Sequence, residues 1–317
     1  MAKYLDPKAD LTFKKVFAEH KDLMISFLNA MLPLNEDGQI KSIEYIPVEL
    51  IPKTPLLKDT IVDVSCKDQQ GRSFIVEMQM IWQPEFLKRV LFNSSKSYVK
   101  QLDKGGAYSD LQPVYSLNLV NDVFRDDTDD YYHDYGIVDI KYNDQVIEDM
   151  HLIFIELPKF KPHNFNDKKM MVLWLRFLTE IDEKTREAPE VLLENPETRK
   201  ALDLVEESAY DDTQMNSYDH FWDVVSTERT YISSAIRQGL RQGIEQGMKQ
   251  GKKQGMKEGK KLGMEQGMKQ GMEQGMEQGM KQSKTDIAKN LLALNIPTET
   301  IMKATGLTEE EISKLKV

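Results

Sequence analysis

The 317-residue sequence contains a single cysteine, Cys66, and it lacks any long apolar run. A lone cysteine excludes an internal disulfide and is typical of proteins kept in a reducing compartment. The sequence also has no secretory signal and no uninterrupted apolar stretch long enough to span a bilayer. We therefore expect a cytoplasmic protein that makes no use of a membrane, with Cys66 as a buried structural thiol in a strand.

Positive charge is scarce as well, because the net charge is -10. Taken alone, this balance argues against a nucleic-acid partner. The distribution is uneven, however, since eleven basic and only five acidic residues lie between Arg237 and Lys284. A protein that is acidic overall can still present a local basic track to phosphates. The chain length is enough for one main domain with appendages.

Two β-rich runs, residues 60–66 and 73–81, flank a short polar turn and predict a β-hairpin. Each run carries an acid where an ordinary core strand would be apolar, Asp63 in the first and Glu77 in the second. Side chains in a strand alternate between faces, so Glu77 and Gln79 share one face. Asp63 and Glu77 stand at comparable distances from the turn, so the two carboxylates are expected to lie close together on paired strands.

Two ionised carboxylates at short range repel each other, and a hard oxygen-seeking cation relieves that repulsion. The pair Asp63 and Glu77 therefore predicts a site for a divalent ion, Mg²⁺ or Mn²⁺, that keeps water in its remaining positions. One of those waters is then available as a nucleophile.

The pattern of Asp63, thirteen intervening residues and Glu77-x-Gln79 resembles the catalytic core of the PD-(D/E)XK nuclease superfamily. It is most similar to the Rpn family of recombination-promoting nucleases, also described as PD-(D/E)XK putative transposases, which have glutamine where the wider superfamily has lysine. The resemblance covers roughly the first 160 residues. Its other matching pieces are residues 10–17, Arg89, Tyr98, residues 105–108 and residues 113–115.

This resemblance implies metal-dependent hydrolysis of phosphodiester bonds in DNA. Asp63 and Glu77 would bind the metal, Glu77 would also orient the attacking water, and Gln79 would stand in the lysine position. Glutamine carries no charge, so a nearby basic residue, Lys58 or Arg89, would have to supply it. The sequence shows no RNase H-like triad for a strand-transfer mechanism. It leaves open whether the task is recombination, transposition or defence against phage.

Asp10 has two interpretations. It stands at the start of an amphipathic helix expected over residues 10–31, where it is a good N-cap residue. The resemblance offers the alternative that Asp10, or Glu19 further along, faces the metal.

The periodicity along the chain predicts the element order αβββαβ, and the resemblance implies a restriction-endonuclease-like α/β fold built on that core. We expect a strand over residues 42–51, the hairpin, a helix over 83–103, and a strand over 113–120. An acidic surface loop over 126–135, with His133 as a surface residue, separates these from further strands at 137–140 and 152–157. Helices are expected at 168–181, 197–208 and 220–237.

Glycine then recurs every fourth residue from Gly239 to Gly279, eleven times. Each glycine costs about 1 kcal/mol in a helix interior relative to alanine, so the tract needs compensation or is disordered. A row of small residues lets a second helix approach closely, and the charged residues between the glycines exclude a membrane span. We favour a helical arm that packs against a second chain, giving a homo-oligomer.

 The specific expectation is a homodimer formed through the arm, and the alternative is a flexible polar tether.

The last segment, residues 285–317, recovers helical periodicity. A capping box at Thr308 to Glu311 and a glycine at Gly306 predict a small helix-turn-helix-like unit. Such a unit can place a helix in the major groove of DNA. Its last helix begins with three glutamates, which repel phosphate, so we favour contact with protein over contact with DNA.

These inferences divide the chain into a nuclease core (1–160), a helical support region (161–236), the glycine tetrad arm (237–284) and the small tail (285–317). The expected function is that of a metal-dependent DNA endonuclease linked to recombination, mobile DNA or phage defence. The alternative is a non-catalytic interaction or assembly protein that uses the arm and the tail.

Overall fold

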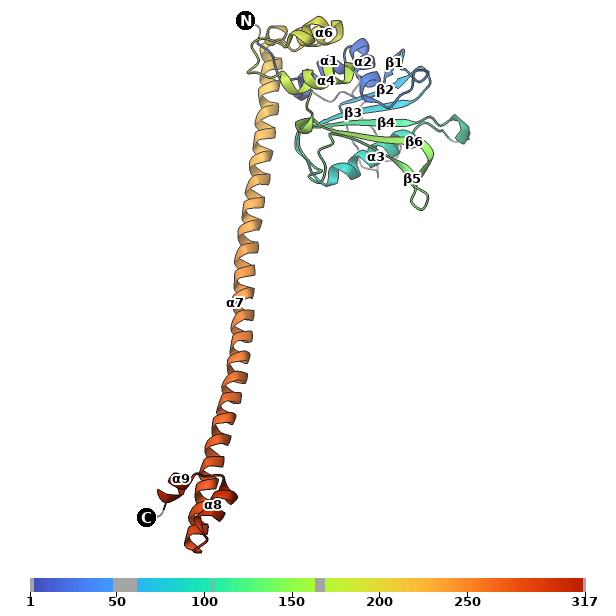
Figure 1. The fold of residues 1–317 in the computed structure, drawn as a ribbon. Coiled ribbons are helices and arrows are strands. Elements are labelled where there is room, and N and C mark those ends of the chain that lie inside the picture. Colours follow the sequence, from blue (N-terminus) through green and yellow to red (C-terminus); the bar gives the residue numbers. More distant parts are fainter. Residues whose placement is uncertain (1–2, 48–61, 104, 163–168, 316–317) are drawn as a thin grey trace. The chain divides into compact units, whose positions relative to one another are not determined.

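The computed structural model describes residues 3–47, 62–103, 105–162 and 169–315 (Figure 1). The chain divides into two compact units, residues 1–232 and residues 233–317. Within the described parts of the chain, every helix is too short or too polar to cross a bilayer.

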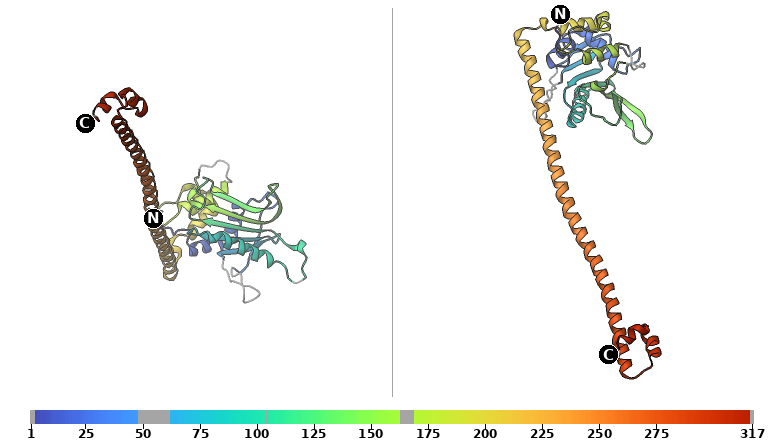
Figure 2. Two further views of the ribbon diagram at one scale, coloured as in Figure 1. Left: turned by 90° about the horizontal axis from the view of Figure 1, so that it is seen from below. Right: turned by 60° about the vertical axis from the view of Figure 1, so that its left-hand side comes forward.

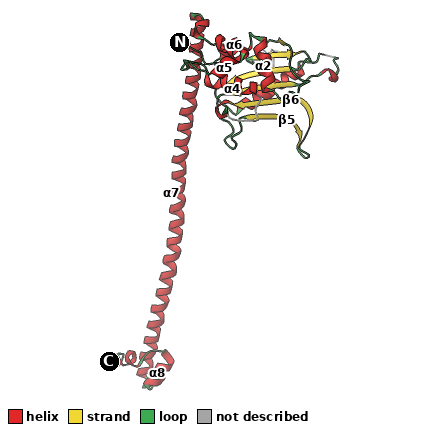
Figure 3. Ribbon diagram, turned by 45° about the horizontal axis from the view of Figure 1, so that its top comes forward, coloured by secondary structure: helices red, strands yellow, loops and turns green. Residues whose placement is uncertain are grey.

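A mixed sheet forms the centre of the first unit (yellow in Figure 3). Its six strands lie in the order β1-β2-β3-β4-β6-β5. Strands β1, β2 and β3 pair antiparallel, β3, β4 and β6 pair parallel, and β5 returns antiparallel to β6. The bounds are Ile43–Tyr45 for β1, Val64–Asp68 for β2, Ser73–Gln79 for β3, Val114–Val120 for β4, Tyr132–Asp139 for β5 and Asp144–Glu156 for β6. The predicted hairpin is therefore confirmed as β2 and β3, although β2 begins at Val64, so Asp63 lies just before the strand and not within it.

Helices cover both faces of this sheet because its central strands are apolar on both sides (Figure 1). The main core joins one face, including Phe74 and Val76 of β3, to α1, α2, α4 and α6. The opposite face, including Ile75 of β3, packs against α3. The helix bounds are Asp10–Phe17 for α1, Lys21–Met31 for α2, Glu85–Val99 for α3, Lys169–Glu180 for α4, Glu190–Glu194 for α5 and Pro196–Leu204 for α6. The order helix, three strands, helix, strand matches the predicted αβββαβ core.

The helix expected over residues 10–31 is in fact two helices. The chain becomes extended at His20, whose Nδ1 lies 2.9 Å from the carbonyl oxygen of Lys15. This break lets α1 and α2 turn separate apolar faces into the same core. The prediction of Asp10 as N-cap is also wrong, because Ala9 occupies that position and the Asp10 carboxylate instead pairs with Lys14 at 2.7 Å.

Three further expectations are wrong, two of them near the sheet edge and one after α6. The stretch 126–135 is not entirely loop, since β5 begins at Tyr132, and the β5–β6 ribbon continues past the rest of the sheet (Figure 2). His133 is buried rather than exposed, because its Nε2 lies 2.8 Å from Oε1 of the buried Glu156. The helix expected to reach residue 208 ends at Leu204, where the chain turns to pair with the N-terminal segment through Leu5.

Helix α7 (Asp212–Ala293) carries the chain into the second unit and includes the whole glycine tract. The tract is thus helical in this structure, as we favoured. A Cβ atom added at any of the eleven tetrad glycines would meet no atom within 4 Å. The residues that follow the glycines are mostly apolar and exposed, for example Leu240 at 64 % and Met268 at 76 %. No packing among the described residues therefore accounts for glycine at these positions.

The tail closes on a small core of its own at the end of α7. Helices α8 (Thr298–Thr305) and α9 (Glu309–Ser313) are joined through Gly306, which has the left-handed φ of 70°. Ala288, Ile301 and Ile312 are fully buried between the three helices. The capping box is confirmed, since Glu311 N–H donates to the Thr308 hydroxyl and the Glu311 carboxylate accepts from Thr308 N–H.

Candidate functional site

The two hairpin acids lie at the same end of the sheet. Val64 of β2 pairs with Val76 of β3, so Glu77 directly follows the last paired residue of β3 and Asp63 directly precedes β2. The charge of Asp63 is close enough to Glu77 to raise the pKa of that carboxyl. The Met78 backbone N–H also donates to Oδ2 of Asp63 at 2.6 Å, which ties this carboxylate to the strand that carries Glu77.

Helix α3 holds the Glu77 carboxylate from the side. Glu77 is only 6 % exposed, and Asn93 Nδ2 donates to its Oε1 at 3.0 Å. The Arg89 Nη2 atom lies 3.7 Å from the other oxygen, Oε2. Arg89 and Asn93 are four residues apart on a helix and therefore share a face. One turn of α3 thus supplies both an amide and a positive charge to Glu77.

Gln79 joins the same group through Arg89. Arg89 Nη2 donates to Gln79 Oε1 at 2.6 Å, while Gln79 Nε2 donates to the Ile81 carbonyl oxygen at 2.6 Å. The guanidinium also lies over the ring of Phe86, 4.7 Å from its centroid. The side chain of Arg89 therefore brings a cation to the position next to the uncharged glutamine.

Loss of contact with water raises the pKa of both carboxyl groups. It raises the pKa of Glu77 to about 7, and the nearby charge of Asp63 pushes in the same direction, against the lowering effects of Asn93 and Arg89. Burial likewise raises the pKa of Asp63 to about 6, although the Met78 N–H opposes the shift. Two neighbouring acids that both resist ionisation are an unfavourable arrangement for a metal-free protein.

The other predicted site residues have mixed placements. Asp10 and Asp63 both line a pocket of about 430 Å³ whose wall also includes His220 of α7. The charge of Asp10 is close enough to raise the pKa of Asp63 further. Lys58 lies outside the described residues. Glu19 is exposed and interacts with Lys15, and the structure does not bring it to the hairpin acids.

The side chains at the site are too few to enclose a metal ion completely, but they are enough for a cation that keeps part of its water shell. Among the described residues, no group of three or more His, Cys, Asp and Glu side chains is placed to hold a metal. Mg²⁺, however, is usually bound through one or two carboxylates and keeps several waters. Asp63 and Glu77 satisfy that requirement. The Asn93 Oδ1 atom beside them is buried and has no hydrogen-bond partner within the described structure.

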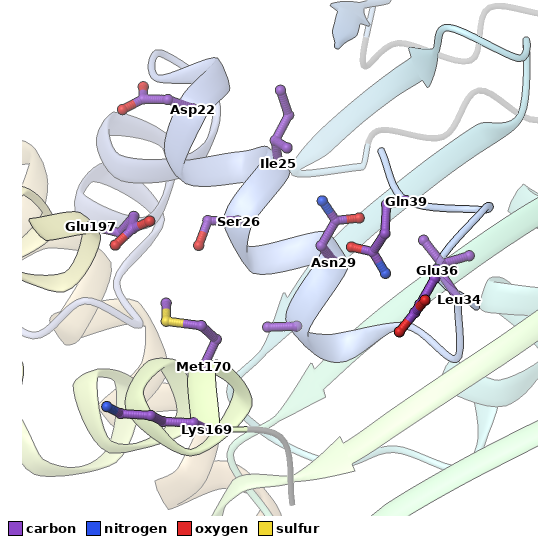
Figure 4. Close-up of a pocket in the computed structure, with 11 residues that line it drawn as sticks. Asp22, Ile25, Ser26, Asn29, Leu34, Glu36, Gln39, Lys169, Met170 and Glu197 are labelled. Carbon is purple, nitrogen blue, oxygen red and sulfur yellow. The ribbon is translucent and has the colours of Figure 1, made fainter. Parts of the chain in front are cut away.

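A second pocket, of about 770 Å³, lies elsewhere in the first unit between α2, α4 and α6 (Figure 4). Figure 4 shows Asp22, Glu36 and Glu197 at its margin and Met170 on its wall. None of the predicted site residues lines it, and Asp22 is already paired with Lys200 at 2.7 Å. It is therefore separate from the candidate site.

Sequence reasoning missed Asn93 and the Met78 N–H. Asn93 carried a usable signal, because it follows Arg89 by one helical turn and both must then face the hairpin. The Met78 N–H had none, since a backbone donor is present at every residue other than proline.

Comparison with known proteins gave two matches to family models. Residues 7–235 match the model described as PD-(D/E)XK nuclease family transposase. Residues 281–317 match the model described as the C-terminal HTH domain of the Rpn/YhgA-like nuclease family. No curated protein and no solved structure matched the chain.

The raised pKa of Glu77 predicts that the metal-free protein is stabilised by Glu77→Gln. Above pH 7 the wild type must bury an ionised Glu77, whereas glutamine stays neutral and keeps an acceptor for Asn93. We expect the variant to unfold with a free energy about 1–3 kcal/mol larger at pH 8. The difference should fade as the pH falls through about 7 towards the ordinary glutamate value, because Glu77 then becomes protonated in the folded protein.

Denaturant unfolding in the presence of a chelator, repeated across this pH range, measures the effect. Glu44→Gln is the matched control, because Glu44 lies exposed on β1 of the same sheet and should show no such difference. Equal stability of wild type and Glu77→Gln at pH 8 would contradict the assignment of a strained, buried carboxylate.

Proposed function

Because the chain belongs to the PD-(D/E)XK nuclease family transposases, we propose that it is a metal-dependent endonuclease that hydrolyses phosphodiester bonds in DNA. We further propose that this activity serves recombination, mobile DNA or phage defence. The observation that carries the proposal is the pair Asp63 and Glu77 at one end of the hairpin: Glu77 is buried in β3, and Asp63, just before β2, accepts a hydrogen bond from the Met78 N–H of β3.

In this proposal Asp63 and Glu77 hold Mg²⁺ or Mn²⁺. When bound, the cation would lower the pKa of a water molecule and offset the negative charge that grows on the phosphate. It would also favour ionised Asp63 and Glu77, which burial otherwise disfavours. The Met78 N–H and Asn93 keep the two carboxylates in position, so little reorganisation is needed for binding.

Arg89 takes over the charge that Gln79 lacks. Its guanidinium is held by Gln79 and by the ring of Phe86, and its side chain remains 46 % exposed. A fixed cation at a solvent-accessible position can contact a phosphate oxygen and stabilise developing negative charge. Gln79 then acts by positioning Arg89 rather than by contributing charge itself.

Plasmid nicking by the purified full-length protein tests the proposal. We expect cleavage that requires Mg²⁺ or Mn²⁺ and stops when a chelator is added. Asp63→Asn and Glu77→Gln should reduce cleavage to background, because each removes a negative ligand while preserving size. Glu44→Gln should cut as the wild type does.

The rival function, a non-catalytic assembly protein, makes the opposite prediction. If the wild type cuts neither DNA nor RNA with any divalent metal, and the two carboxylate variants keep the cellular effect of the wild type, the endonuclease proposal is wrong. Cleavage of RNA alone would keep the chemistry and change the substrate.

Loss of the Arg89 cation should lower the cleavage rate strongly. Arg89→Gln is expected to reduce kcat by about 10²–10³-fold, the usual effect of removing one donor that stabilises transition-state charge. The charge of Arg89 also lowers the pKa of Glu77. In Arg89→Gln, the fall in cleavage rate on the acid side of the pH profile should therefore begin at a higher pH.

The control is Lys88→Gln, which removes an exposed positive charge from the adjacent position on α3. Arg89→Lys should recover part of the rate. An unchanged rate and pH profile in Arg89→Gln would mean that another residue supplies the charge.

We also propose that the glycine tract forms a homodimer by packing against the arm of a second copy. The exposed row of glycines with no neighbour within 4 Å supports this, since a helix that remained alone would be more stable with alanine there. Replacing Gly267, Gly271 and Gly275 by alanine tests it. If a dimer depends on close approach of the two arms, the variant should have a lower molecular mass in light scattering. The backbone amide hydrogens of its arm should also exchange with solvent faster.

A lone helix should respond in the opposite way. The backbone amide hydrogens of its arm should exchange with solvent more slowly, because each alanine stabilises a helix by about 1 kcal/mol relative to glycine. Its molecular mass should not change.

A further inference from the structure

The lysines of the arm are concentrated in one short stretch. Six lysines and one glutamate lie between residues 249 and 261, whereas residues 262–280 contain one lysine and three glutamates. In most tetrads the glycine is followed by an apolar residue, but Lys252 and Lys260 occupy that position here, and Lys253 and Lys261 follow them. We call residues 249–261 the lysine segment. All its side chains are exposed on α7.

Helical geometry gathers these lysines on one side. At about 100° per residue, the six lysines fall within roughly half of the helix circumference, and Glu258 falls outside that arc. Glu258 is instead bonded by Gln254 at 3.0 Å. The glycines of the segment, Gly251, Gly255 and Gly259, lie about 170°, 150° and 110° from the centre of the lysine arc. A second helix packed on the glycines would therefore leave the lysines accessible, except for Lys252 at the edge of the arc nearest Gly259.

The composition of the segment selects among anionic partners. Its only apolar residue is Met256, so there is no apolar face to enter a lipid surface. No aromatic residue occurs after Tyr231, so the unit has no platform on which unpaired bases could stack. What remains is a row of exposed cations on one continuous helix, of which Lys261 also lies 4.0 Å from the Glu265 carboxylate. Such a row matches a regular array of phosphates.

We propose that the lysine segment binds the phosphate backbone of double-stranded DNA without reading its sequence. This inference rests on the proposed function, because it identifies a second surface through which the nuclease would engage its substrate. The surface is distinct from the carboxylate site and requires no metal.

The test compares the full-length wild type with the variant in which Lys252, Lys253, Lys260 and Lys261 are all replaced by glutamine. Binding to labelled duplexes of two unrelated sequences is measured by fluorescence anisotropy, in chelator, at several salt concentrations. Each phosphate contact contributes about 0.9 to the slope of log affinity against log salt, so the slope should fall by about 3–4. Between 50 and 200 mM salt, the wild type should weaken by about a hundredfold more than the variant, on both sequences.

Two control variants isolate the cause. Replacing Lys269, Lys281, Lys284 and Lys289 by glutamine makes the same change in net charge on the same unit and should leave the slope nearly unchanged. Replacing the four test lysines by arginine should preserve the slope. Circular dichroism checks that every variant keeps its helix content.

The outcomes separate this inference from the nuclease proposal. An unchanged slope in the glutamine variant overturns the inference even if the protein cuts DNA. An unchanged slope together with a lower mass in light scattering overturns it in favour of a lysine contact with a second copy. A reduced slope in a protein that never cuts supports the inference while the nuclease proposal fails.

Discussion

Two neighbouring acids that resist ionisation are the constraint on which the first unit depends. Glu77 is buried in β3, and Asp63 lies just before β2, where the Met78 N–H ties it to β3. A folded protein tolerates such an arrangement only if neighbouring groups hold the carboxylates, because an unpaired buried charge is costly. The Met78 N–H, Asn93 and Arg89 perform that task from one strand and one turn of α3. Neighbouring carboxyl groups with raised pKa values are typical of a site built for a ligand rather than for stability.

The same chain also contains a segment with almost no packing at all. The first unit buries large side chains such as Trp174, Phe17 and Phe154 on both faces of its sheet. The glycine tract exposes nearly every side chain and places glycine where alanine would favour the helix. The first unit therefore owes its structure to its own core, while the arm has the features of a surface intended for other molecules. Our two proposals for the arm use different sides of the helix, so they are compatible.

Much of the first unit was predictable because its signals are local. The hairpin follows from two β-rich runs around a polar turn, and α3 from apolar residues at helical spacing. The break at His20 was not predictable from periodicity, since the apolar pattern continues through it, and only packing of α1 and α2 into one core separates the two helices. His133 has no partner at ligand spacing in the sequence, and its burial depends on Glu156 from a neighbouring strand.

The sequence by itself determined which residues could carry charge or chemistry: the two acids, the glutamine that replaces lysine, the four-residue glycine period and the clustered lysines. These are properties of spacing, and a strand or helix converts spacing directly into direction. Only the tertiary structure decided which groups meet. Arg89 reaches Gln79 and Glu77, and Asn93 reaches Glu77, because α3 crosses the end of β3. Those contacts depend on how a helix packs on a sheet, which the spacing of residues within either element does not specify.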